Sequence, residues 1–209
     1  MGVYLSAYIA DWPRLAAELS RVRAGASDRK RWRAGDASVG HFPLGWDRDG
    51  WGVKARFPDN GWPLYKPHRE FQEIWSEVIE CLQGEHDERW DKSLLWDDLI
   101  NDTDEFIDGV FGGGIAVDPE EAARWASCTE IIAAYAWLAH SPAHVTTLAQ
   151  VWRRLSGKTG ELRPYIEPQF DSDSRFISRF EEFEQHLHCW AVIVEQAHQL
   201  QWGLVIALG

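Results

Sequence analysis

The chain lacks the features that mark several large classes of protein. Its 209 residues contain three cysteines, Cys81, Cys128 and Cys189, and no C-x-x-C pair. Widely spaced cysteines in odd number predict neither a disulfide framework nor a structural zinc site, so we expect buried, reduced thiols. No run reaches the roughly 18 consecutive apolar residues of a membrane span, and the first 13 residues meet Asp11 early. We therefore expect a cytoplasmic protein with no membrane partner.

Positive charge is also scarce, whereas tryptophan is abundant. The chain has 21 Lys and Arg against 33 Asp and Glu, which gives a formal net charge of −12. A negative field repels phosphate backbones, so nucleic acid is excluded as the expected partner, and a basic protein or a small-molecule ligand is favoured. The 13 tryptophans predict aromatic-rich cores, an aromatic-lined pocket, or both, because each indole brings a large contact area.

The spacing of apolar residues predicts an α+β fold. Residues 3–9 alternate as a strand does, and Asp11 and Pro13 indicate a helix start. Apolar residues at helical spacing predict helices from His68, over residues 118–138, from Ser141, and from Ser174 to about Gln199, and residues 202–209 predict a buried strand. We expect one domain over residues 1–209, in which a small β-sheet that includes the N- and C-terminal strands packs with several helices and a long C-terminal helix.

Residues 35–68 interrupt this pattern with Gly, Pro, Asp and Trp, and we interpret them as a loop or hairpin insertion. Asp49 and Gly50 favour a tight hairpin that would place Trp46 and Trp51 at its base, with a strand at 53–57. These tryptophans, together with Trp62, either line an exposed binding site or cover the core from a long loop.

Several short motifs occur in a familiar order. They are MGVYLSAYIAD at the start, DERWD at 87–91, FIDGVFGGG at 106–114, and a long helix followed by GLVIALG. In this order they resemble the YfbM-like family, small bacterial proteins of largely unknown function. The resemblance implies an α+β fold and no established activity. The chain departs from the family pattern in its insertion at 35–68, and in Leu94 where a histidine is expected, so a site built on that histidine is not expected.

The segment 86–109 is strongly acidic. A calcium loop is excluded, because Phe106 stands where an oxygen ligand is needed. The segment is typical of a solvated helix face. The functional alternative is a surface for a basic partner, which would use Trp90, Asp91 and Trp96, with tryptophan as the aromatic anchor.

Two other motifs contain residues of types that are found in catalytic or phosphate-binding sites. Helical spacing places Glu184, His188, Glu195 and His198 on one face, so Glu184 could orient His188 as a general base, although such pairs are also common on helix surfaces. The motif SGKTG at 156–160 lacks the first glycine of a phosphate-binding loop and predicts a helix end with a turn.

No metal or cofactor is expected from the histidines. His186 and His188 are two apart and point away from each other on a helix, and His140 and His144 straddle a helix start at Pro142. The leading hypothesis is a non-catalytic cytoplasmic binding or accessory protein, of an immunity-like kind, that presents an acidic, tryptophan-rich surface. The alternative is a small-molecule enzyme or ligand-binding protein with an aromatic-lined pocket and the Glu184/His188 acid–base pair.

Overall fold

The fold is taken from a computed structural model of the chain. The structure describes residues 5–15, 17, 52–54, 65–83, 98–111, 114–116, 138–170 and 176–208. Its strands are β1 (Leu5–Ala10), β2 (Gly52–Lys54), β3 (Gly114–Ala116), β4 (Leu138–His140) and β5 (Gly203–Leu208). Its helices are α3 (Tyr65–Gln83), α4 (Asp98–Phe111), α6 (Pro142–Leu155), α7 (Arg163–Ile166) and α8 (Phe180–Leu200), with 3₁₀ turns η2 (Thr159–Leu162) and η3 (Glu167–Gln169).

The five strands form one sheet in the order β2-β1-β5-β4-β3. The terminal strands β1 and β5 lie side by side and antiparallel, with Leu5 opposite Leu208 and Ala10 opposite Gly203. At the other side of β5, β4 is antiparallel to it, and β3 then pairs parallel with β4. The predicted α+β fold, with both terminal strands in one small sheet, is confirmed.

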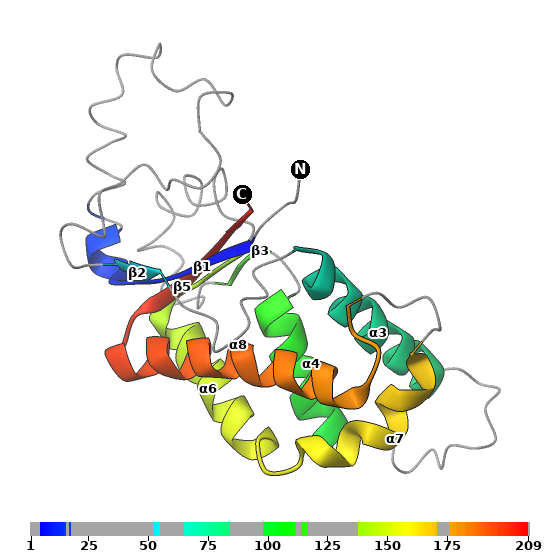
Figure 1. Cartoon of the computed structure of the whole chain (residues 1–209). Coiled ribbons are helices and arrows are strands. Elements are labelled where there is room, and N and C mark those ends of the chain that lie inside the picture. Colours follow the sequence, from blue (N-terminus) through cyan, green and yellow to red (C-terminus); the bar gives the residue numbers. More distant parts are fainter. Residues whose placement is uncertain are drawn as a thin grey trace.

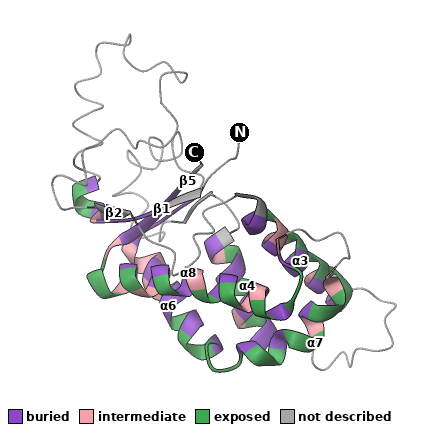
Figure 2. Ribbon diagram, viewed as in Figure 1, coloured by how far each residue is buried: buried purple, intermediate pink, exposed green. Residues whose placement is uncertain are grey.

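The helices lie together on one side of the sheet (Figure 1), where α6 contacts both α4 and α8. The predicted long C-terminal helix is confirmed, and its apolar stripe is buried: Phe180, Phe183, Leu187, Trp190 and Val194. The stripe meets α3, where the ring of Phe183 stacks on that of Phe71 with centroids 4.3 Å apart. Figure 2 shows these buried faces directed towards one another, so the helices share a continuous core.

Local capping explains where two helices begin. The backbone N–H of Arg14 donates to the Asp11 carboxylate (3.3 Å), and residues 12–15 are helical. The backbone N–H of His144 donates to the Ser141 hydroxyl (3.3 Å), and Pro142 is the first residue of α6. Both caps satisfy N–H groups that lack a partner in the first turn of a helix, as the sequence predicts.

Three predicted boundaries differ from the structure. Helix α3 begins at Tyr65, before His68. Helix α8 begins at Phe180 instead of Ser174, since its N-cap residue Arg179 has an extended backbone. Just before the helix, the Glu182 carboxylate accepts the backbone N–H of Ser178 (2.8 Å). The predicted helix over 118–138 was wrong at its end, since Leu138 pairs with Ile206 in the sheet.

One glycine prediction and one cysteine prediction are corrected as well. Gly109 and Gly112 to Gly114 were expected to end the helix in 86–109, and α4 ends at Phe111, so Gly109 lies inside the helix and does not end it. A Cβ on Gly109 would collide with the Leu148 side chain, so glycine permits the close approach of α4 and α6. Cys81 is exposed and Cys189 half-buried, so the expectation of buried thiols was wrong for Cys81.

Candidate functional site

A groove of about 280 Å³ lies between α3 and α4. Its lining residues recur at helical spacing, so each helix contributes one face: Gln72, Trp75, Ser76, Ile79 and Glu80 from α3, and Asp104, Ile107 and Asp108 from α4. Trp75 and Ile107 are buried, whereas Ser76, Glu80, Asp104 and Asp108 are exposed. The groove therefore combines an apolar floor with an acidic, solvent-facing rim.

A hydrogen bond joins the two helices that line the groove. The indole Nε1 of Trp75 donates to Oδ1 of Asp104 at 2.9 Å, which links α3 to α4. Trp75 is otherwise buried, so the bond satisfies its one polar atom. It also fixes the direction of the Asp104 carboxylate, whose second oxygen keeps its capacity to accept a hydrogen bond.

The acids of α4 divide into two groups by their partners. On one side, Arg154 of α6 holds Asp102 through contacts of 2.6 Å and 3.1 Å and approaches Glu105 at 3.5 Å. The hydrogen bond to Asp102 raises the pKa of Arg154, so this guanidinium stays charged. On the groove side, Asp104 and Asp108 form no ion pair within the part of the chain that the structure describes.

The third acid of the groove rim, Glu80 of α3, has no ion pair among the described residues either. None of the described residues that line the groove is a lysine or an arginine. The three carboxylates around this opening repel each other and favour a positively charged group between them. The arrangement can therefore bind a cation whose apolar part lies on Trp75 and Ile107.

The predicted acid–base face of α8 meets α6 and η2. The Thr159 hydroxyl donates to Oε1 of Glu184 (2.7 Å), and His188 places its ring edge-on to Trp152, with centroids 4.9 Å apart. Further along α8, Arg153 binds both oxygens of Glu195 (3.0 Å and 2.9 Å), and Nδ1 of His198 lies 3.2 Å from the hydroxyl of Thr146.

Each of the four residues on this face thus has its own contact with α6 or η2. No hydrogen bond joins Glu184 to His188 in the part of the chain that is described. The predicted partner of the His188 imidazole is engaged by Thr159 instead, while His188 itself is exposed. The acid–base role of the pair stays a prediction.

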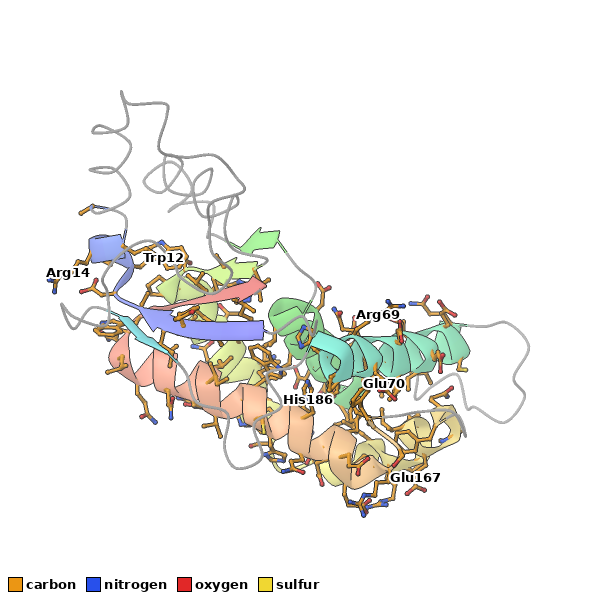
Figure 3. The ribbon with its side chains drawn as sticks, turned by 45° about the horizontal axis from the view of Figure 1, so that its top comes forward. Trp12, Arg14, Arg69, Glu70, Glu167 and His186 are labelled. Carbon is orange, nitrogen blue, oxygen red and sulfur yellow. The ribbon has the colours of Figure 1, made fainter. Side chains whose placement is uncertain are left out.

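Two buried histidines lie between α3 and α8. Burial, with a smaller effect of His186, lowers the pKa of His68 to about 2, and burial lowers that of His186 to about 4. Their ring centroids are 6.1 Å apart, and the His186 ring lies 5.0 Å from that of Phe71. Figure 3 places His186 between α8 and the beginning of α3. Both imidazoles are neutral at pH 7 and serve as core side chains.

A second pair, His140 and His144, lies where β4 meets α6. Burial lowers the pKa of His140 to about 3 and that of His144 below its usual value. Their rings stack with centroids 4.6 Å apart and an interplanar angle of 25°. Lone pairs in nearly parallel ring planes do not converge on one ion.

The residues predicted to bind a ligand or partner, Trp46, Trp51, Trp62, Trp90, Asp91 and Trp96, lie outside the described residues. The groove residues were not among the predicted site residues. In the sequence, Trp75 belongs to the apolar spacing of its helix, and Asp104 and Asp108 belong to the acidic segment 86–109. The available signal was the four-residue spacing of these two aspartates, which places them together on one side of α4.

Among the described ranges, no group of three or more His, Cys, Asp or Glu side chains is placed to hold a metal ion. In the same ranges no helix is both long and apolar enough to cross a membrane. Comparison with known protein families, with characterised proteins and with solved structures found no match. The resemblance to the YfbM-like family therefore stays a prediction.

Proposed function

We propose that the chain is a non-catalytic binding protein whose groove between α3 and α4 takes a cationic group of a basic protein partner or ligand. The observation that carries this proposal is the set of three rim carboxylates, Glu80, Asp104 and Asp108, around an apolar floor. The net charge of −12 supports it, since a negative field attracts basic partners from a distance and speeds their association.

The contrast within α4 also supports the proposal. Asp102 is neutralised by a two-point contact with Arg154, whereas Asp104 faces the groove with an indole as its hydrogen-bond donor. An indole N–H orients a carboxylate without cancelling its charge. The groove thus keeps a negative carboxylate in a fixed direction, which lowers the ordering cost when a cation binds.

Fluorescence anisotropy with a labelled oligo-arginine peptide tests the proposal. We expect binding that weakens as salt rises, because exposed charges are screened. The double variant Asp104→Asn/Asp108→Asn should weaken binding about tenfold, which corresponds to about 1.4 kcal/mol. An oligo-glutamate peptide should not bind.

The matched control is Glu77→Gln/Glu161→Gln, which removes the same charge from exposed positions outside the groove lining. An equal loss of affinity in both double variants would mean that overall charge, and not the groove, attracts the peptide. A lysate pull-down at low and high salt then searches for the natural partner.

The enzymatic alternative stays a prediction. Its aromatic residues Trp46, Trp51 and Trp62 lie outside the described residues, and Glu184 and His188 each contact another side chain.

A further inference from the structure

The junction of β4 and α6 holds one buried and one half-buried imidazole that the proposed binding function does not use. His140 is the last residue of β4 and is 1% exposed, and His144 lies in the first turn of α6. Their stacked rings connect the strand to the helix on either side of Ser141, which caps α6 and is itself fully buried.

Among the described residues, three buried ring nitrogens of this pair have no hydrogen bond of good geometry: Nδ1 and Nε2 of His140, and Nε2 of His144. A neutral imidazole carries one N–H, and burying this donor without a well-placed acceptor costs free energy, because water would hydrogen-bond to it. Ring packing therefore contributes most of what holds the pair, and this packing is favourable while both rings are uncharged.

The groups around His140 do little to stabilise its protonated, charged form. Helix α4 contributes the carbonyl of Gly109, which favours the protonated ring but is outweighed by burial. Strand β5 contributes the uncharged Gly203 and Leu204. The indole of Trp12, which lies beside the sheet (Figure 3), packs on Gly203.

On α6, His144 is the one titratable group among the described residues whose charge acts on His140, and that charge would be repulsive. The positive end of the α6 helix dipole disfavours a cation at the same place.

We propose that His140 and His144 form an acid-sensitive latch, which holds the N-terminus of α6 against β4 at neutral pH and releases it when the rings take up protons. Release separates the stacked rings and frees the first turn of α6, where the backbone N–H groups of His144 and Val145 are bonded to Ser141. Because β4 also pairs with β5, release loosens the sheet beside the C-terminal strand.

The direction of the pH effect follows from linkage. In the open state both imidazoles regain a pKa near the ordinary value of 6.5, while in the closed state burial holds both values lower. Opening therefore binds up to two protons as the pH falls below about 6.5, and none above it. The closed state is therefore fully favoured at neutral pH. This preference is lost progressively as the pH falls towards the pKa values that the two imidazoles have in the closed state.

Hydrogen exchange by mass spectrometry on the full chain, corrected for the intrinsic rate, tests the latch at its own amides. Between about pH 6 and pH 5 we expect the protection of a peptide over 138–148 to fall by up to about 100-fold per pH unit, since two protons are linked to opening. His144→Phe keeps a stacked ring and removes one proton, so the fall should drop to about tenfold per unit.

His186→Phe is the matched control, because it removes a buried neutral histidine from the core between α3 and α8. It should leave the slope of the 138–148 peptide unchanged. The latch is refuted if protection of this peptide does not change with pH, if His144→Phe keeps the wild-type slope, or if the peptide opens only together with α3 and α8.

Discussion

The indole of Trp75 and the carboxylate of Asp104 are 29 residues apart in sequence, and a hydrogen bond of 2.9 Å between them joins α3 to α4. The bond lies in the groove that we propose as the cation site. Trp75→Phe removes the donor while keeping most of the apolar surface, so we expect a loss of about 1 kcal/mol in the free energy of unfolding. Oligo-arginine affinity should fall as well, because the carboxylate loses its fixed direction. Urea denaturation and anisotropy measure the two effects.

Trp202→Phe is the control for Trp75→Phe, since Trp202 is half-buried against the core and lies outside the groove lining. It should leave peptide affinity unchanged. If Trp75→Phe binds oligo-arginine with wild-type affinity, the hydrogen bond does not contribute to binding in the groove.

The stack of Phe71 and Phe183 connects α3 to α8 in the centre of the core. Phe183→Ala should lower the free energy of unfolding by about 3–5 kcal/mol, because a fully buried ring leaves a cavity. Val192→Ala on the exposed side of the same helix should change it by less than about 0.5 kcal/mol. Similar midpoints in urea for the two variants would contradict the assigned faces of α8.

Gly203 begins β5 where the sheet has no room for a side chain. A Cβ there would collide with the ring of Trp12 and lie 2.7 Å from the carbonyl oxygen of His140. Gly203→Ala should destabilise the protein by about 1–3 kcal/mol or more, as overpacking does. Gly157→Ala has open space around the new methyl group and should stabilise by about 0.4–1 kcal/mol through the unfolded state. Thermal melts of both variants measure these changes in stability. A Gly203→Ala variant that is as stable as the wild type would contradict the prediction.

Acid should destabilise the whole fold through the buried histidines. Burial lowers the pKa of His68, His140 and His186 to about 2, 3 and 4, so the unfolded chain binds more protons below its ordinary value of 6.5. The stability from these groups is complete above pH 6.5 and falls with pH, by up to about 1.4 kcal/mol per pH unit for each histidine. Urea titrations at about pH 7, 6 and 5 measure the slope, and His186→Phe should reduce it by one histidine's share.

His188→Ala tests what remains of the acid–base prediction. The side chain is exposed and contacts the edge of Trp152, so we expect a loss of less than about 1 kcal/mol. Any catalytic activity found for the protein should disappear in this variant if His188 is its general base. Full turnover in His188→Ala would remove the Glu184/His188 pair as a catalytic site.

Local sequence determined much of the secondary structure. The caps at Asp11 and Ser141, the apolar spacing of α6 and α8, and the alternation in β1 each depend on residues within a few positions of one another. Helix and strand formation respond to these short spacings, so their approximate places could be predicted from the sequence. The terminal strands were also assigned to one sheet, since short strands need a neighbour to satisfy their backbone groups.

Only the tertiary structure decided which side chains act together. Strands β3 and β4 have three residues each, too few for a periodic signal. They form because β4 pairs with β5, and β3 in turn pairs with β4. The acids of α4 look alike in sequence, yet Asp102 faces Arg154, 52 residues away, while Asp104 faces Trp75. Such contacts depend on the path of the whole chain. The groove is therefore a product of packing between two helices and depends on contacts that no local pattern encodes.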